Sequence, residues 1–142
     1  MTQSGRPHPS DAGSHRTGDA PVVVVVPADP AYLSVLRTAS AGLAARLDLD
    51  LDEIEDLRIA IDEASTLLIL GAGDGERLRA EFRLGDDELD ITVSGPLTQL
   101  PERTSIAWSV LEALAGEVVA HTGSDGRPSS VRLIHRRRRP RP

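Results

Sequence analysis

Cysteine and lysine are absent from the 142 residues of this chain, and aromatic residues are scarce. Without cysteine, the protein has no disulfide framework, no thiolate zinc site and no cysteine nucleophile. The only aromatic side chains are Tyr32, Phe82 and Trp108, so the core must be built from leucine, valine, isoleucine and alanine. We expect no metal site, because metal-ligand spacing is not found among the histidines, which are His8, His15, His121 and His135.

Long apolar runs are also missing. No stretch approaches the roughly 18 residues of a membrane-spanning helix, and the N-terminus lacks the apolar segment of a signal peptide. We therefore expect a cytoplasmic protein without membrane contact. A chain of 142 residues is typical of one domain with a core of its own.

Charge is unevenly distributed along the chain. The net charge is −6, but residues 132–142 contain six arginines and no acid. Residues 21–131 carry about −12, from 20 acidic residues against eight arginines. Such an acidic body argues against direct DNA binding by the folded domain and is compatible with a basic protein partner.

These patterns divide the chain into three segments. Residues 1–20 are rich in serine, glycine, proline, histidine and arginine, which predicts a disordered leader. Residues 21–135 form the folded domain, and residues 136–142 form a basic tail. Two interpretations of the tail stay open: a solvated, disordered end, or an electrostatic contact with nucleic acid or with the acidic body of a second copy.

The longest helical pattern runs from Asp50 to Leu70. Asp50 and Glu53 have the form of an N-terminal capping box, and Gly71 ends the helix. Its buried face recurs every three or four residues, at Ile54, Leu57, Ile61, Ala64 and Leu68. A second line beside that stripe is either a place for carboxylate chemistry or a solvated rim, and consists of Asp56, Ala60, Glu63 and Leu67.

The chain before this helix predicts a strand and a shorter helix. The valine run Val22–Val26 suits a strand covered on both faces, and Pro21 is tolerated at an edge. Asp29 as N-cap and Pro30 begin a helix that runs to about Leu47. Its inward stripe is Leu33, Leu36, Ser40, Leu43 and Leu47, while Tyr32, Arg37 and Arg46 fall outside it.

The chain after the central helix predicts a hairpin, a helix and a last strand. Residues 77–84 and 88–93 alternate apolar and polar residues around a tight turn. Residues 104–119 predict a helix with Trp108 beside an inward stripe of Ile106, Val110, Leu114 and Val118. A short strand covers residues 131–135. Because the strands are few, we expect the sheet to be completed by residues 95–102 or by a partner chain.

Three segments together resemble the anti-sigma regulatory factors, in particular those that act on actinobacterial stress and sporulation sigma factors. These segments are VPADPAYLSVLRT (26–38), DLRIAIDEASTLLI (56–69) and SIAWSVLEALAGEV (105–118). The family shares the Bergerat ATPase fold with histidine kinases and gyrase. The resemblance, with the element order, implies a two-layer α/β (α+β) sandwich: a mixed, mostly antiparallel sheet with helices on one face.

The resemblance also implies a function. Members sequester an alternative sigma factor, are antagonised by a STAS-type anti-anti-sigma protein, and act as homodimers. Many phosphorylate that STAS protein on serine or threonine with Mg-ATP. Two main hypotheses follow for this chain: an anti-sigma factor that acts by binding alone, or an active serine/threonine kinase of its STAS partner. A third is a degenerate module of this fold that scaffolds another regulator or binds a different ligand in the vacated pocket.

The positions that match the family's nucleotide motifs favour the binding hypothesis. Glu63 matches the glutamate that activates the attacking hydroxyl, but Leu67 stands where an asparagine binds Mg²⁺. Ser94 and Gly95 stand where an aspartate–glycine motif reads adenine, and Ser105 and Ala107 where glycines wrap the phosphates. The site therefore resembles a degenerate one, and we expect no cofactor; ATP and magnesium belong to the kinase alternative.

A partner-binding residue also carries over by resemblance. The family places an arginine of the first helix eleven residues before an aspartate that precedes the second helix, and this arginine contacts both sigma and STAS partners. Arg37 and Asp48 hold that spacing, and exposed Tyr32 and Ser34 could share the surface. The other interpretation is an ordinary exposed helix arginine.

Overall fold

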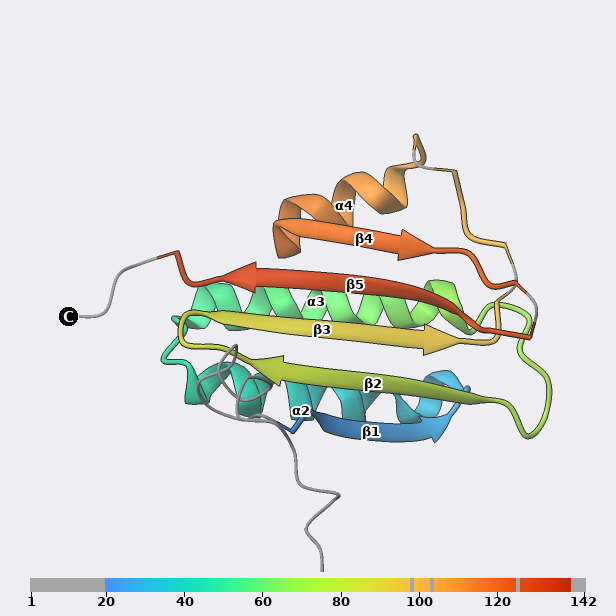
Figure 1. Cartoon of the computed structure of the whole chain (residues 1–142), viewed down its shortest axis with the longest axis horizontal. Coiled ribbons are helices and arrows are strands. Elements are labelled where there is room, and N and C mark those ends of the chain that lie inside the picture. Colours follow the sequence, from blue (N-terminus) through green and yellow to red (C-terminus); the bar gives the residue numbers. More distant parts are fainter. Residues whose placement is uncertain (1–19, 98, 103, 125, 139–142) are drawn as a thin grey trace, which may run out of the picture.

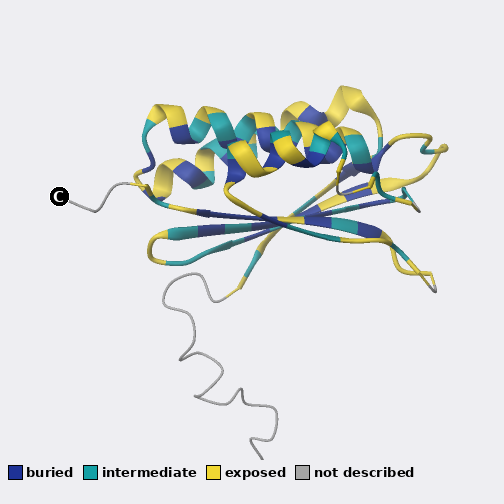
Figure 2. Cartoon of the chain, turned by 90° about the horizontal axis from the view of Figure 1, so that it is seen from above, coloured by how far each residue is buried: buried dark blue, intermediate teal, exposed yellow. Residues whose placement is uncertain are grey.

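The computed structural model describes residues 20–97, 99–102, 104–124 and 126–138; the predicted leader, apart from Ala20, and the last four tail residues lie outside these ranges. A five-stranded sheet carries all the helices on one face (Figures 1 and 2). This confirms the predicted two-layer fold. The elements are β1 (Val22–Pro27), η1 (Pro30–Tyr32), α2 (Leu33–Arg46), α3 (Leu51–Leu68), β2 (Arg77–Leu84), β3 (Glu88–Gly95), α4 (Ile106–Ala115), β4 (Glu117–His121) and β5 (Ser129–Arg136).

The strands lie in the order β1-β2-β3-β5-β4, and the four strand pairs within the described ranges are all antiparallel. The predicted hairpin is confirmed as β2 and β3, where Ala80 lies opposite Val93 and Phe82 opposite Ile91. Alternation along each strand sends these apolar side chains to the helix-covered face. The charged and hydroxyl side chains between them occupy the other face.

The central helix follows its predicted pattern. The side chain of Asp50 accepts a hydrogen bond from the backbone N–H of Glu53 at 2.8 Å, as an N-cap does. Four of the five stripe residues are fully buried, and Ile54 is half-buried. The preceding helix also begins as predicted, after a short 3₁₀ turn, because the Asp29 carboxylate accepts from the N–H of Ala31.

The predicted helix over residues 104–119 is wrong at its C-terminal end. Gly116 has φ = 97°, a left-handed conformation that glycine adopts without steric cost, and it ends α4. The β-branched pair Val118 and Val119 then belongs to β4, which pairs with β5. The fifth strand of the sheet thus comes from inside the predicted helix, and the described residues 96, 97 and 99–102 form no strand.

The predicted stripe of α4 is also wrong. Ile106 is 80% exposed, whereas Trp108, Leu111 and Ala115 are buried. These three residues recur at spacings of three and four, so they define a different buried face of the same helix. Trp108 is therefore a core residue and not a neighbour of the stripe.

The valine strand β1 is an edge strand, and the prediction that both its faces are covered is wrong. Val22, Val23 and Val25 are 41–46% exposed, and Val26 alone is buried. The helices cover one face of the sheet only, so Val23 and Val25, on the other face, remain open to solvent, and Val22 is exposed at the start of the strand. Within the described ranges, no helix is both long and apolar enough to cross a membrane.

Gly95 gives a test of how closely β3 and α3 pack. A Cβ atom at this position would lie 2.8 Å from Cβ of Leu68 and 2.9 Å from its carbonyl oxygen. We expect Gly95→Ala to lower the free energy of unfolding by about 1–3 kcal/mol, because the backbones must separate. Thermal and urea denaturation followed by circular dichroism measure the change.

Gly42 supplies the matched control. It lies in α2, and a Cβ there would meet nothing within 4 Å. Gly42→Ala should raise stability by about 0.5–1 kcal/mol through the helix preference of alanine. Equal stability of the Gly95→Ala variant and the wild type would contradict the close approach.

Candidate functional site

The residues that match nucleotide motifs lie around the C-terminal half of α3. Glu63 is exposed on this helix, and Leu67, one turn later, is half-buried and packs against the core. Mg²⁺ requires oxygen ligands, which a leucine side chain does not have. At its C-terminal end, the predicted line therefore presents the exposed carboxylate of Glu63 followed by an apolar contact at Leu67.

The structure does not bring Ser94 to this region. Gly95 faces α3, as its close approach to Leu68 shows. Because side chains alternate along a strand, Ser94 lies on the opposite face of the sheet, between Arg79 and Ser130 in the strand register. The chain then continues along α3, with the N–H of Leu97 donating to the carbonyl of Leu68 at 3.1 Å.

An aromatic side chain, Trp108, packs at the start of α4. Ser105 is the N-cap by backbone conformation, but its hydroxyl makes no cap hydrogen bond, and Ala107 is half-buried in the first turn. Trp108 is buried, and its indole N–H donates to the carbonyl of Pro101 at 2.8 Å. The indole thus joins the irregular segment before α4 to the helix.

These residues do not fit a magnesium–nucleotide site of the kind that the resemblance implies. Leu67 offers no oxygen, and Ser94 lies on the other face of the sheet. Over the described ranges, no group of three or more His, Asp or Glu residues is arranged to hold a metal ion.

A groove between α2 and α3 holds the predicted partner residues. Its volume is about 710 Å³, and Ser34 and Arg37 line it from α2. Arg37 donates to Oδ1 of Asp62 at 2.6 Å, and both side chains are a little over one-third exposed. The remaining lining residues combine an apolar part with charges of both signs: Thr38, Ala41, Leu51, Asp52, Ile54, Glu55 and Arg58.

The other predicted partner residues lie beside this groove. Tyr32 is exposed at the end of η1, one turn before the groove begins. Asp48, which marks the family spacing from Arg37, lies in the turn after α2, and Arg37 contacts Asp62. An apolar strip flanked by Arg37 and Arg58 is the arrangement found in protein–protein interfaces.

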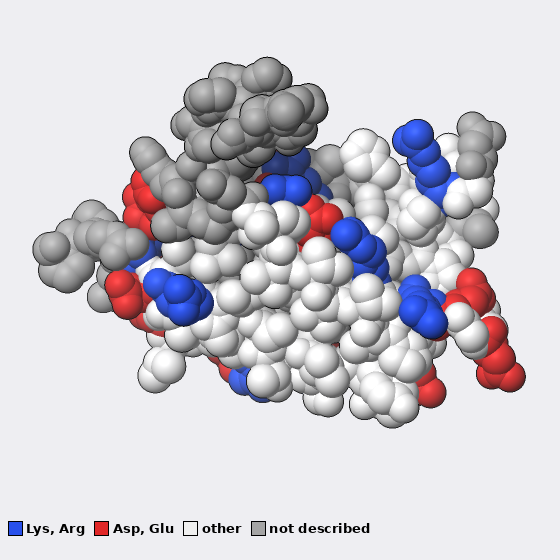
Figure 3. Space-filling view, turned by 60° about the horizontal axis from the view of Figure 1, so that its bottom comes forward, with Lys and Arg blue, Asp and Glu red and all other residues white. Residues whose placement is uncertain are grey.

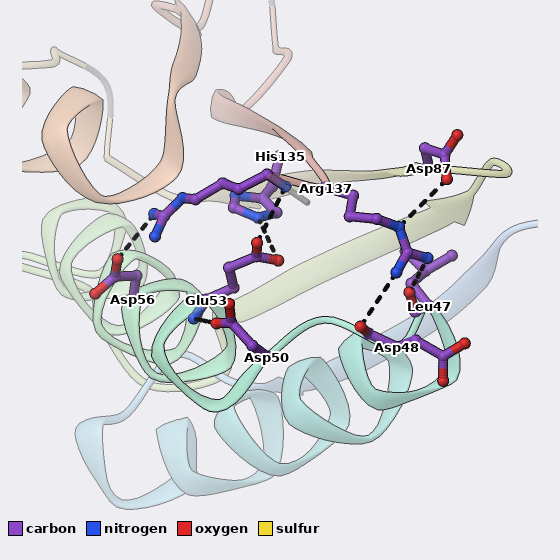
Figure 4. Close-up of polar contacts among 9 residues, drawn as sticks. Leu47, Asp48, Asp50, Glu53, Asp56, Asp87, His135 and Arg137 are labelled. Atoms are coloured by element: carbon purple, nitrogen blue, oxygen red, sulfur yellow. Dashed lines mark hydrogen bonds and ion pairs between the residues drawn. The ribbon is translucent and has the colours of Figure 1, made fainter. Parts of the chain in front are cut away.

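The arginine tail contributes to a second polar cluster (Figure 4), in which Arg137 is bound by the protein and is not part of a solvated end. The Arg137 side chain is 6% exposed and donates to the backbone carbonyls of Leu47 and Asp48, as well as to the carboxylate of Asp87. The backbone N–H of Arg137 also donates to the carbonyl of Asp87 at 2.7 Å. This arginine thereby joins the end of α2 to the turn between β2 and β3.

Arg138 and His135 contact the first turns of α3. The backbone N–H of Arg138 donates to Oε1 of Glu53 at 3.0 Å, and Nε2 of His135 lies 3.5 Å from the other oxygen of that carboxylate. The Arg138 side chain donates to Asp56 at 2.9 Å, and this hydrogen bond raises the pKa of Arg138. Glu53 and His135 are both buried.

The sequence patterns did not predict this cluster. Glu53 has the place of a capping-box glutamate, yet its carboxylate turns to β5 and the tail. The available signal was the unequal charge: the tail is basic and the turns around Asp48 and Asp87 are acidic. Because of that imbalance, the acidic body of the same chain can be the partner of the tail, just as the acidic body of a second copy can.

Known proteins resemble the chain in sequence. It is 36% identical over 101 residues to a protein of Mycobacterium tuberculosis named anti-sigma-F factor RsbW, with 70% of this chain and 59% of that protein covered. It is 34% identical over 76 residues to the serine-protein kinase RsbW of Listeria innocua, with 51% and 48% covered. The chain thus spans about half the length of the curated relatives it matches. No protein-family model matches it.

A solved structure resembles the fold. The crystal structure of the RsbU and RsbW domains of a Mycobacterium tuberculosis protein superposes with a TM-score of 0.62 at 20% identity. The alignment covers 82% of this chain and 32% of the other. At this identity the similarity shows a shared fold.

Proposed function

Since the chain belongs to the anti-sigma regulatory factor family, we propose that it is an anti-sigma factor that sequesters an alternative, stress or developmental sigma factor. In this proposal, a STAS-type anti-anti-sigma protein takes the same surface and releases the sigma factor. Both partners act in the cytoplasm, where we place this protein. The chain acts by binding, and its nucleotide site is degenerate.

The groove between α2 and α3 is the observation that carries this proposal. It presents the predicted residues Arg37 and Ser34 beside an apolar strip that includes the exposed Leu51. Arginine is enriched among residues that dominate binding energy, and Arg37 lines the groove with its guanidinium held by the ion pair with Asp62. The acidic body around the groove favours a partner with a basic surface.

Serine/threonine kinase activity toward the STAS partner is the alternative. It is supported by the exposed Glu63 and by relatives named serine-protein kinase. The residues at the magnesium and phosphate positions oppose it, because Leu67, Ser105 and Ala107 do not supply the oxygen ligand and the glycine backbone that those contacts require.

A homodimer is part of the same proposal, and β1 is the edge that would form it. The described β1 pairs only with β2, and exposed Val22, Val23 and Val25 carry no charge that would repel an identical copy. Figure 3 looks onto the side where β1 and α2 lie and shows a broad surface with few charged side chains. Five consecutive valines pair with their own antiparallel copy about a two-fold axis, valine opposite valine.

We expect Arg37→Glu to weaken capture of the sigma factor at least about 30-fold, the loss typical of a central interface residue. Affinity is measured by surface plasmon resonance with purified sigma subunit. Arg127→Glu makes the same charge change at an exposed turn between β4 and β5 and should leave binding unchanged. Equal binding by the Arg37→Glu variant and the wild type would refute the interface.

We expect no transfer of labelled phosphate from Mg-ATP to the STAS partner and no Mg-ATP thermal shift. Leu67→Asn restores one oxygen ligand, yet should remain inactive because Ser94 and the start of α4 are unchanged. Phosphate transfer that Glu63→Gln abolishes would instead establish the kinase alternative.

We expect Val25→Glu to convert the dimer, of twice 15.2 kDa, to the monomer in light scattering after gel filtration. A charge at the centre of the paired edges has to be buried without a partner. Ile59→Glu is the control, because Ile59 is 41% exposed on α3 against 46% for Val25 and lies off the edge. A dimer that persists in Val25→Glu places the contact elsewhere.

A further inference from the structure

The turn between α2 and α3 has a backbone conformation that needs support. Asp48 in this turn has φ = 58°, and it is the only described non-glycine residue with a positive φ. The left-handed conformation is unfavourable for an L-residue, although aspartate tolerates it better than most. The conformation therefore persists only where neighbouring contacts fix it.

Arg137 supplies such contacts from the other end of the chain. Its guanidinium donates to the carbonyl of Asp48 itself and to that of Leu47, the residue before it. Carbonyls at a helix C-terminus lack partners within the helix, and a cation there also interacts favourably with the helix dipole. Because the side chain is buried, solvent screens these contacts far less than a surface ion pair.

Arg138 contacts the next element, α3, through its backbone and through a side chain that is 47% exposed. Its N–H and its side chain bind Glu53 and Asp56, one turn apart on α3. The groove residues Asp52 and Glu55 occupy the same two turns and alternate with them. The tail and the groove therefore lie on different sides of one short helical segment.

We propose that Arg137 and Arg138 form an intramolecular latch, which fixes the α2–α3 turn and so sets the geometry of the groove between the two helices. The effect on binding rests on the proposed function of that groove, whereas the latch itself does not. Residues that follow β5 thus control a surface built from residues 34–58. In the engaged latch, the Arg137 guanidinium is bound to the protein's own backbone and is not free for nucleic acid.

Amide hydrogen exchange of the full-length chain tests the latch directly. In Arg137→Ala, we expect the amides of Asp48, Leu49, Glu53 and Ile54 to exchange about tenfold faster, since the variant loses charge-assisted hydrogen bonds. Amides at the centre of β2 and β3 should keep their wild-type rates. Arg137→Lys keeps the charge without the planar fork, and should give an intermediate increase.

Arg136→Ala is the matched control. Arg136 is the adjacent arginine and also makes two ion pairs, but these join Glu88 and Glu117 on the sheet. Its loss should leave the four α2–α3 amides unchanged. The latch is refuted if Arg137→Ala leaves those amides at wild-type rates, or if it accelerates all amides by one common factor, which marks a general loss of stability.

Binding of the sigma subunit then tests the coupling. We expect Arg137→Ala to weaken capture about tenfold and Arg136→Ala to leave it unchanged, by surface plasmon resonance at fixed salt concentration. If exchange is faster but sigma capture is not weaker, the latch exists but does not affect binding at the groove. Loss of the proposed function is recognised separately, because the wild type would then fail to bind sigma while the exchange pattern stays as described.

Discussion

The burial of one face of α3 against the sheet is the constraint on which the rest of the structure depends. The stripe of Leu57, Ile61, Ala64 and Leu68 is fully buried, and Gly95 lets β3 come close to the last of these residues. With so few aromatic side chains, the core gains its area from many aliphatic contacts, which require close approach of backbones. α2 and α4 then pack on α3, so its position fixes the groove on one side and the segment around Trp108 on the other.

Arginine is the only permanent cation of this protein, and its planar fork shapes the polar contacts. On the open face of the sheet, Arg132 makes two parallel hydrogen bonds to Asp90, at 2.9 and 2.6 Å. Hydrogen bonds from Arg79 and then Arg83 lower the pKa of Glu81. Such exposed pairs contribute little stability. The same fork has a larger effect at the buried Arg137, where its several N–H groups reach two carbonyls and a carboxylate.

Local patterns predicted most of the fold, because periodicity and caps act over a few residues. They predicted α3, its Asp50 cap and the β2–β3 hairpin. They failed at residues 117–121, where the apolar spacing of a helix continued past Gly116 although two β-branched valines favoured a strand. In the candidate site, Arg37 and its neighbour Ser34 were singled out by the family resemblance and not by a local pattern. The contact of Arg37 with Asp62, which joins residues 25 positions apart, was not predicted. The latch lies further from local prediction, since it joins residues about 90 positions apart.

Each of three sides of α3 has a different role, and together these roles suit the fold for binding. One side is committed to the core, a second lines the groove, and a third is held by the tail at Glu53 and Asp56. A catalytic nucleotide site would need an oxygen ligand for magnesium near Leu67, where this chain has an apolar contact with the core. It would also need backbone accessible to phosphates near Ser105, where Trp108 instead joins α4 to the preceding segment. Apolar side chains at these positions, in place of polar ligands and glycines, favour close packing of the helix layer. A rigid helix pair, fixed at its turn by Arg137, loses less conformational entropy when a partner docks on it.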